Sequence, residues 1–390
     1  MKKTITTEKI PLYLWLDDLE DGALLQALDL ANLPVAFHHI AIMPDSHLGF
    51  GMPIGGILAT RDAVVPNAVG VDIGCGMCSL RTSLTGLHPA QLREIMGLIR
   101  RLVPVGFQHH KEDQPESVMP ALPDESSRLT PVSEREFAKA RRQVGTLGGG
   151  NHFIELQQGS DGYVWIMIHS GSRNIGLQVA EHYHKLAMAR TEARKEKGAV
   201  PKDLSFFRAD DPLYHAYLAE MRFCIAFALA NRKLMMQRVQ EAVAAVAGDI
   251  SFSGFINKPH NFADTETHYG EEVLVHRKGA TRAREGEPGM IPGSQGSPSY
   301  IVRGKGNPLS FASCSHGAGR VMSRNAARRK LDLKAEQQKL EKMGVLHAVR
   351  GKRDLDEAPS SYKNIRQVMA NQQDLVEIVT ELKPLAVIKG

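Results

Sequence analysis

Two long stretches of the chain, residues 174–197 and 212–247, carry apolar side chains at helical spacing. Apolar residues that recur every three or four positions line one face of an α-helix, so each stretch predicts a helix whose stripe packs in the core. In the second stretch these residues are Leu218, Met221, Phe223, Ile225, Leu229, Leu234, Val239 and Val243. A third helix is predicted over residues 320–343, where the basic run 328–330 is typical of a solvated helix face.

Elsewhere the pattern consists of short apolar runs separated by glycine-rich turns. The runs at residues 164–168, 254–256 and 273–276 predict strands, and we expect the loops between them to converge on one site. Residues 108–135 are polar, rich in proline and serine, and poorly periodic, which predicts a mobile excursion over the surface. No internal repeat and no sharp change in composition divides the chain, so we expect one domain over residues 1–390.

Composition narrows the class of protein. The chain has 390 residues, of which 43% are hydrophobic and 23% charged, and no run approaches the roughly 20 apolar residues that span a membrane. The N-terminus lacks the apolar segment and cleavage site of a signal peptide, and four scattered cysteines are too few for a disulfide framework. We therefore expect a cytoplasmic protein with no membrane contact. The formal net charge of +5 favours a polyanionic partner such as nucleic acid.

Six segments place a histidine or cysteine beside glycine or another polar residue. They are residues 43–47, 72–76, 148–155, 168–173, 258–261 and 315–320. Each segment alone also fits a structural role, because a single histidine at the end of an apolar run is usually hydrogen-bonded to its neighbours. Together, four of the segments supply one carboxylate, one thiol and three imidazoles, which are Asp72, Cys75, His152, His169 and His260.

This set of side chains suits a borderline divalent metal ion. Asp72 and Cys75 are three residues apart across a glycine, so both can turn toward one ion. Five ligands exceed the four of a structural zinc site. We therefore interpret the set as two ions bridged by the thiolate, an arrangement that phosphoryl chemistry often uses. Ligand type alone leaves zinc, iron and manganese open.

The spacing Cys75-Gly-Met-Cys78 also fits a redox pair or one half of a zinc knuckle. No second pair with this spacing occurs in the chain. A redox motif should open a helix, whereas glycines at positions 70, 74 and 76 predict a loop. We therefore expect Cys78 to be structural and Cys75 to be the ligand.

Residues 315–320, Ser-His-Gly-Ala-Gly-Arg, have the character of a phosphate-binding loop. Glycines around His316 let the backbone approach a phosphate, their N–H groups can hold its oxygens, and the helix predicted next adds its positive N-terminus. His316 can act there as a nucleophile, as an acid or base, or as a further metal ligand, and Arg320 can neutralise phosphoryl charge. No Walker motif GxxxxGK[ST] occurs, so any nucleotide is held without a P-loop.

Taken in order, these segments resemble the signatures of the RtcB family of RNA ligases across nearly the whole chain. The matching segments are MPDSHLG at 43–49, PNAVGVDIGCG at 66–76, LGGGNHFIE at 147–155, HSGSR at 169–173, HRKGAT at 276–281, IPGS at 291–294, SHGAGR at 315–320 and the terminal Lys389-Gly390. Agreement at eight separated sites is not expected by chance. The resemblance implies a mixed α/β fold particular to that family, with β-sheets around a deep basic cleft, surrounding helices, and two Mn²⁺ ions.

The resemblance also implies roles for residues that match the family by position. One manganese would be held by Asp72, Cys75 and His152, and the other by Cys75, His169 and His260. His316 matches the histidine that takes GMP, and Arg173 and Arg320 match contacts to RNA. The implied nucleotide contacts are Asn151, Glu155, Ser294, His316, Gly317, Ala318, Gly319, Tyr362 and Lys389, with the last two at guanine.

The implied reaction joins RNA ends at the expense of GTP, in RNA repair or splicing. His316 takes GMP from GTP, GMP passes to an RNA 3′-phosphate that can derive from a 2′,3′-cyclic phosphate, and a 5′-hydroxyl then displaces GMP. Two other functions remain open at this point. A metal-dependent RNA phosphoesterase would use the same ligands without GTP. An RNA-binding protein could have kept the fold and lost ligation.

Overall fold

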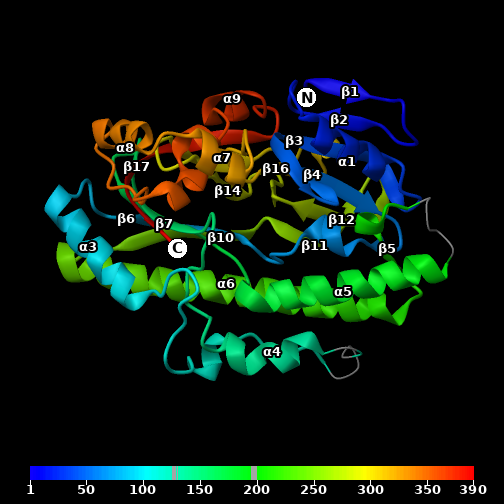
Figure 1. Cartoon of the computed structure of the whole chain (residues 1–390), viewed down its shortest axis with the longest axis horizontal. Helices are drawn as coiled ribbons and strands as arrows, with labels where there is room; N and C mark the ends of the chain where they lie inside the picture. The colour runs from blue at the N-terminus through cyan, green and yellow to red at the C-terminus, as the bar shows by residue number, and fades with distance from the viewer. Residues whose placement is uncertain (125–128, 130, 195–199) are drawn as a thin grey trace.

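Two large β-sheets and a set of outer helices make up the architecture, which is mixed α/β as the resemblance implied (Figure 1). The computed structural model describes residues 1–124, 129, 131–194 and 200–390. The first sheet has six strands in the order β1-β2-β3-β4-β12-β11. Their bounds are β1 Lys3–Ile5, β2 Leu12–Leu14, β3 Ala36–Phe50, β4 Met52–Thr60, β12 Glu271–Lys278 and β11 Asn261–His268.

The second sheet has seven strands in the order β10-β6-β8-β7-β17-β15-β14, and each neighbouring pair is antiparallel. Their bounds are β10 Phe252–Pro259, β6 Gly76–Thr82, β8 Val164–Ser170, β7 Phe153–Gly159, β17 Val376–Lys389, β15 Ser299–Gly304 and β14 Pro288–Ile291. Two small sheets pair β5 Ala63–Val64 with β9 Phe207–Arg208, and β13 Ala280–Arg282 with β16 Ser313–Ser315.

The helices lie outside the sheets, and α5 and α6 run along one side of the molecule with α4 beyond them (Figure 1). The α-helices are α1 Asp21–Ala31, α2 Pro66–Val69, α3 Pro89–Leu102, α4 Val132–Ala140, α5 Arg173–Ala193, α6 Pro212–Ala247, α7 Arg324–Lys330, α8 Leu333–Lys342 and α9 Ile365–Ala370. The short 3₁₀ helices are η1 Glu116–Val118, η3 Lys202–Leu204, η4 Pro308–Ser310, η5 Lys352–Glu357 and η6 Pro359–Ser361.

Helix α6 confirms the helix that the apolar period predicts over residues 212–247. Asp211 caps it by accepting a hydrogen bond from the N–H of Leu213, and Pro212 occupies the first turn. The predicted stripe is core: Val239 packs with β7 and β8 across one face of the seven-stranded sheet, and Met221 packs against α5. The helix thereby covers one face of the seven-stranded sheet.

The other predicted elements have mixed outcomes. The runs at 164–168, 254–256 and 273–276 lie in β8, β10 and β12, so these strands are confirmed. The helix predicted over 174–197 is α5, which ends at residue 193, and residues 195–197 fall outside the described residues. The expected surface excursion is largely exposed up to residue 124, but its end forms α4, which packs in the core.

The single helix predicted over residues 320–343 is wrong. Two shorter helices occupy this region, and the first begins only at Arg324. Ser323 caps α7 and Asp332 caps α8, each by accepting a backbone N–H, and Leu331 between them has an extended backbone. The basic run 328–330 is exposed, as its pattern predicted.

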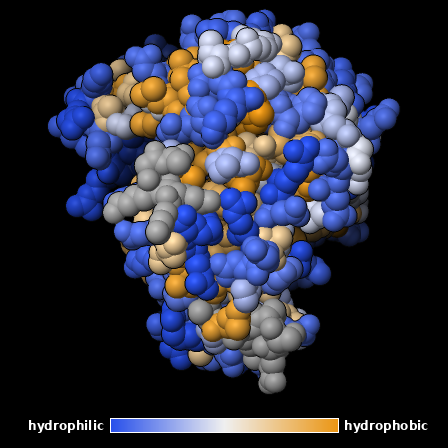
Figure 2. Space-filling model, turned by 90° about the vertical axis from the view of Figure 1, so that its right-hand side faces the viewer, coloured by the Kyte–Doolittle hydropathy of each residue, from blue (hydrophilic) through white to orange (hydrophobic). Residues whose placement is uncertain are grey.

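The face of the molecule shown in Figure 2 is mostly hydrophilic, and its hydrophobic residues form small separate patches. Among the residues that the structure describes, no helix is long and apolar enough to span a membrane.

Candidate active site

The register of the seven-stranded sheet brings the predicted ligands to one end of it. β6 begins at Gly76, which lies opposite Ser170 at the end of β8 and Pro259 at the end of β10. β7 begins at Phe153, which lies opposite His169. A side chain at position 76 would collide with the backbone of β10, so glycine allows the strands to approach there. The register gathers four of the five predicted ligands, Cys75, His152, His169 and His260.

These side chains form two triads that share Cys75. The first is Asp72, Cys75 and His152, the second is Cys75, His169 and His260, and the ligand atoms within each triad lie within 4.8 Å of one another. The Cys75 sulfur is 3.5 Å from Nε2 of His152 and 3.3 Å from Nε2 of His169. His152 Nε2 is 3.3 Å from Asp72 Oδ2. The structure therefore brings together all five predicted ligands in the two groups that the resemblance implied.

Backbone carbonyls orient two of the imidazoles. Nδ1 of His152 is 3.0 Å from the carbonyl oxygen of Leu147, and Nδ1 of His169 is 3.1 Å from that of Asn151. A carbonyl only accepts, so each Nδ1 carries the proton and each Nε2 offers a lone pair. Burial lowers the pKa of His169 and His260 well below the usual value, which keeps both rings neutral as metal ligands require.

A cation fits the space between these groups. Burial raises the pKa of the Cys75 thiol, and the neighbouring Asp72 carboxylate raises it further, so a thiolate is favoured there only beside positive charge. His260 Nδ1 is buried and has no hydrogen-bond partner among the described residues. The fully buried Arg232 of α6 donates to the carbonyls of Gly74 and Ser170, at 2.9 and 2.8 Å, and holds the loop ends in place.

Cys78 is separate from both triads. Its side chain is buried within β6 and contacts the carbonyl of Arg232 at 3.8 Å. Burial raises the pKa of this thiol to about 12, which makes it unreactive. Cys75 and Cys78 are both free thiols, and the second begins no helix. The arrangement therefore matches a structural Cys78 rather than a redox pair.

His316 lies beside the second triad. It directly follows β16, whose Ser315 pairs with Ala280 of β13, and the N–H of Ala280 donates to the carbonyl of His260 at 3.1 Å. The ring centroids of His260 and His316 are 4.8 Å apart. The candidate metal centre and the predicted nucleophile therefore belong to one connected structure.

A buried carboxylate, that of Asp45, orients His316. Its Oδ2 lies 2.7 Å from Nδ1 of His316 and accepts from the N–H groups of His316 and Gly317 at 3.1 and 3.2 Å. Burial would raise the pKa of Asp45, but the His316 imidazole and the side chain of Ser315 lower it, so the carboxylate is ionised. Nδ1 faces the carboxylate and Nε2 is left for the cavity. The N–H group of Gly317, which was expected to hold a phosphate, instead binds Asp45.

All nine predicted nucleotide contacts line one cavity of about 190 Å³, together with His169, His260 and Arg320. Within it, burial raises the pKa of Glu155 to about 8, and Gln157 donates to its carboxyl at 2.5 Å. Burial therefore favours the protonated form of Glu155. Because α7 begins at Arg324, no helix N-terminus follows Arg320 directly, and the Arg324 side chain lines the cavity instead.

Glu357 links the cationic residues at the far end of the cavity. Its carboxylate lies 2.6 Å from Nζ of Lys389, 2.8 Å from Arg324 and 3.3 Å from Arg320, and it accepts from the hydroxyl of Tyr362 at 2.5 Å. Lys389 is the last residue of β17, an interior strand, so this end of the chain does not fray. The tail is held where the resemblance implied a guanine contact.

Arg173, the other predicted RNA contact, lines a neighbouring cleft rather than this cavity. Its backbone has a φ of 61°, in the left-handed region that non-glycine residues rarely adopt, and its Nε donates to Thr146 at 3.2 Å. Such strain is often retained where a side chain must be aimed. Arg320 lines the cavity, where Glu357 partly neutralises it.

Three site residues have no role in the sequence analysis. Asp45 lies in the recognised segment 43–47, and its signal is a carboxylate two residues before a histidine. Arg232 is an arginine within an otherwise apolar helical stripe, which is a signal of a buried charge. Glu357 follows Asp356 shortly before Tyr362, and only the folded chain shows that it meets three cations.

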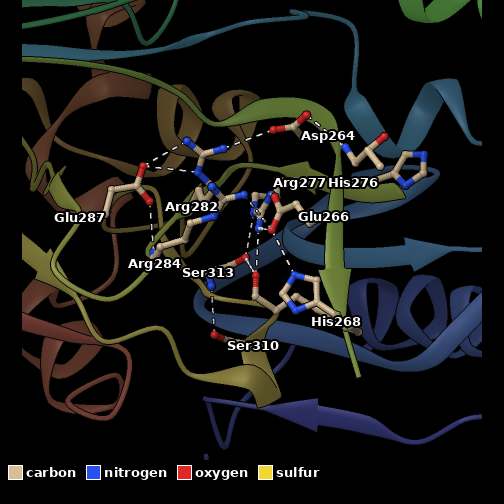
Figure 3. A network of polar contacts seen from close by, with 12 residues as sticks. Asp264, Glu266, His268, His276, Arg277, Arg282, Arg284, Glu287, Ser310 and Ser313 are labelled. Atoms are coloured by element: carbon tan, nitrogen blue, oxygen red, sulfur yellow. Dashed lines mark hydrogen bonds and ion pairs between the residues drawn. The ribbon is translucent and has the colours of Figure 1, made fainter. Parts of the chain in front are cut away.

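A buried network holds the strand that leads to His316 (Figure 3). The Arg277 guanidinium of β12 pairs with Glu266 of β11 at 2.5 Å and donates to Ser313 Oγ at 2.8 Å and to the carbonyl of Phe311 at 2.9 Å. Burial would raise the pKa of Glu266, but Arg277 and His268 lower it to about 2. The network therefore anchors β16 to the six-stranded sheet.

The fold and these two adjoining sites define a class of protein, one with a buried candidate metal centre that shares a cysteine between two sets of ligands, beside a histidine in a cavity. The family model described as "tRNA-splicing ligase RtcB" matches residues 26–390. The RNA-splicing ligase RtcB1 of Escherichia coli strain ATCC 25922 is 38% identical over 408 residues, covering 99% of each chain. The RNA-splicing ligase RtcB of Escherichia coli K12 is 37% identical over 408 residues, with the same coverage.

A more distant relative is the tRNA-splicing ligase RtcB of Pyrobaculum aerophilum, 32% identical over 463 residues, covering 98% of this chain and 95% of that one. The chain therefore belongs to the RtcB family, as its motifs predicted.

Proposed function

We propose that this chain is an RNA ligase that uses GTP and Mn²⁺ to join an RNA 3′-phosphate or 2′,3′-cyclic phosphate to a 5′-hydroxyl, in RNA repair or splicing. The observation that carries the proposal is the adjacency of two groups. The triads that share Cys75 lie beside His316, and Asp45 holds Nδ1 of that histidine. Family membership supports the same function, because the relatives are named RNA-splicing or tRNA-splicing ligases.

Five side chains would hold two manganese ions. Asp72, Cys75 and His152 form one set, and Cys75, His169 and His260 form the other. When bound, the ions supply Lewis acidity that offsets negative charge on phosphoryl oxygens. Mixed carboxylate, imidazole and thiolate ligands also bind zinc and iron, so the choice of manganese rests on the family.

In the first step, Nε2 of His316 attacks the α-phosphorus of GTP. A phosphorus–nitrogen bond forms as the bond to pyrophosphate breaks, which leaves GMP on the histidine. Asp45 keeps the proton on Nδ1 and offsets the positive charge that the ring acquires. Arg320 and Arg324 line the cavity and can neutralise the phosphate groups.

Guanine would lie at the end of the cavity that contains Glu155, Tyr362 and Lys389. Lys389 can donate to the carbonyl oxygen of guanine, and the carboxyl of Glu155 can accept from its ring N–H. An oxygen of the RNA 3′-phosphate then attacks the phosphorus of the GMP and releases His316. In the last step the 5′-hydroxyl attacks the activated 3′-phosphate, loses its proton, and expels GMP.

Labelling with α-³²P-GTP and Mn²⁺ tests the first step. The wild type should form an acid-labile protein–GMP adduct and join RNA ends, whereas His316→Ala should form no adduct and join no 3′-phosphate. RNA turnover without an adduct would instead indicate a phosphoesterase. An adduct that leads to no joined RNA would indicate a protein that has lost ligation.

An RNA whose 3′-phosphate already carries GMP separates the nucleophile from the metal ligands. His316→Ala should keep its manganese and seal this RNA, because a covalent carrier is no longer required. His169→Ala should fail with both RNAs, because it removes a metal ligand. If His316→Ala loses its manganese and is inactive on the activated RNA, then His316 is a ligand and the covalent step lies elsewhere.

A further inference from the structure

A second cleft opens from the nucleotide cavity. Its volume is about 1250 Å³, several times that of the cavity, and the two share Gln295, Arg324, Glu357 and Lys389 as lining residues. A polymer that reaches His316 through this opening would therefore lie along the cleft.

Three consecutive glycines, residues 148–150, lie between two arginines of the cleft, and the last two of them line its floor. A side chain at Gly148 would collide with the guanidinium of Arg173, and one at Gly150 would lie 3.5 Å from the guanidinium of Arg324. The glycines thus let two cationic groups lie directly over the backbone. The same segment continues into Asn151 and His152, so the floor leads to the candidate metal centre.

The walls of the cleft carry arginines together with three acidic residues, which are Asp354, Asp356 and Glu357. Arg324 and Arg328 share the Asp356 carboxylate. In contrast, neither Arg173 nor Arg353 forms an ion pair within the part of the chain that the structure describes, although both line the cleft. Unpaired guanidinium groups along a groove favour a chain of phosphates.

A solvent-exposed aromatic ring, that of Phe107, lies in a loop next to the three glycines. Phe107 is 100% exposed, and no other large hydrophobic side chain in the described ranges is more than 63% exposed. Its loop is nevertheless held in place, because the N–H of Gly106 donates to the carbonyl of Gly148 at 3.0 Å and Val105 bridges the same residue. The ring is therefore presented to solvent on a backbone that is fastened to the floor.

We propose that Phe107 is a stacking platform for an unpaired base of the RNA substrate near its reacting end, while Arg173 and Arg353 bind the adjacent phosphates. This inference rests on the proposed function. An exposed aromatic face beside a cationic groove is the arrangement that binds single-stranded nucleic acid without reading its sequence. The platform positions the RNA strand and takes no part in transfer of GMP.

Binding of fluorescent single-stranded RNA, measured by anisotropy in Mn²⁺ without GTP, tests the platform. Two oligonucleotides are used, one ending in a 3′-phosphate and one beginning with a 5′-hydroxyl. Phe107→Ala should weaken binding of at least one of them by roughly 5- to 150-fold, the range of base stacking on an aromatic ring. Phe107→Leu should lose as much, whereas Phe107→Trp should bind like the wild type.

Phe255→Ala is the matched control, since Phe255 is 45% exposed on β10 and lines neither the cavity nor the cleft. It should bind RNA like the wild type. All Phe107 variants should form the protein–GMP adduct at the wild-type rate. If a Phe107 variant that binds RNA more weakly also forms the adduct more slowly, then Phe107 does affect GMP transfer and the proposed role is wrong.

Abasic nucleotides identify the stacked base. In the wild type, one abasic position near the reacting end should weaken binding, and in Phe107→Ala the same change should have no further effect. The inference is wrong if no abasic position weakens binding to the wild type more than binding to Phe107→Ala. It is also wrong if Phe107→Leu binds like the wild type. A wild type that binds RNA through Phe107 yet never forms an adduct would instead contradict the proposed function alone.

Discussion

The chemistry of His316 depends on one carboxylate that lies far from it in the sequence. Asp45 comes from β3 and His316 follows β16, yet Asp45 Oδ2 is 2.7 Å from Nδ1 of the histidine. An imidazole attacks phosphorus only through an unprotonated nitrogen, so the carboxylate decides which nitrogen is available. In the same way, Cys75 belongs to both triads and so joins the five candidate ligands into one proposed metal centre.

Asp45→Asn should slow formation of the protein–GMP adduct by about 10²- to 10⁴-fold. The amide can donate to Nδ1 and so favour the tautomer that carries its proton on Nε2. Initial rates with α-³²P-GTP measure the effect, and manganese content should not change. Ser46→Ala is the control, because the neighbouring Ser46 hydroxyl is buried and has no partner in the described residues. Loss of manganese in Asp45→Asn would show that Asp45 acts through the metal centre.

Cys75→Ala should lower bound manganese from about two ions per chain to less than one and abolish adduct formation, because Cys75 belongs to both triads. Cys78→Ala should keep its manganese, since Cys78 is buried away from both triads. Elemental analysis after gel filtration measures the metal. Equal loss in the two variants would mean that the effect is on folding rather than on ligation of the metal.

Strand β16 reaches the active site because a buried network fastens it to the β11–β12 hairpin. Arg277 lies at the centre of this network and is fully buried (Figure 3). An ion pair of this kind stabilises little by itself, but removal of one partner leaves a buried charge unpaired. The position of His316 therefore depends on a pair of residues that touch no substrate.

Arg277→Met should lower the free energy of unfolding by about 3 to 5 kcal/mol, because Glu266 would stay buried and lose its closest cationic partner. Arg61→Met is the control, since Arg61 pairs with Glu271 of the same strand β12 at an exposed position and should cost far less. Urea unfolding followed by tryptophan fluorescence compares the two. Equal losses would contradict the assigned role of the network.

The same pair predicts a dependence of stability on pH. Glu266 has a folded pKa of about 2 against 4.5 in the unfolded chain, so its stabilising contribution is complete above pH 4.5 and is lost as pH falls through 2. The total is about 3 kcal/mol, of which roughly half should disappear between pH 5 and pH 3. In Glu266→Gln this part of the pH dependence should be absent. Identical pH profiles for the variant and the wild type would refute it.

The C-terminal strand and the central motifs of the chain line the same cavity. β17 is an interior strand of the seven-stranded sheet, and it delivers Lys389 to Glu357 beside the residues of the central motifs. The two sheets, the loop before β6 and the C-terminus thus all contribute to a single site. We therefore expect a short truncation at the C-terminus to act at the candidate active site.

Deletion of Lys389-Gly390 should weaken GTP use by roughly 1.5 to 3 kcal/mol, the scale of a hydrogen bond to a charged group, and should relax discrimination against ATP. Lys383→Met, an exposed position on the same strand, is the control for a general effect on β17. Adduct formation at varied GTP and ATP concentrations measures both quantities. A truncated protein with wild-type affinity for GTP and wild-type selectivity would show that the tail has only a structural role.

Local pattern was sufficient for elements whose signals lie within the element. The apolar period alone predicts the helix over 212–247 with its bounds, and the Asp211-Pro212 start and the glycine at 248 seen in the structure are local signals too. The helix over 320–343 was wrong because the caps at Ser323 and Asp332, which are also local, compete with a charged pattern that runs through both. Strands 164–168 and 273–276 were found, but their partners were not.

The sequence by itself determined the family, the kinds of ligand available, and the grouping of Asp72, Cys75 and the three histidines as candidates. Only the tertiary structure decided what these residues face. Register between strands sets distances between residues that are about 100 positions apart, and no short-range pattern encodes it. For the same reason, the roles of three residues can be read only from the folded chain. Asp45 contacts the imidazole of His316, Glu357 contacts three cationic side chains, and the ring of Phe107 is exposed to solvent.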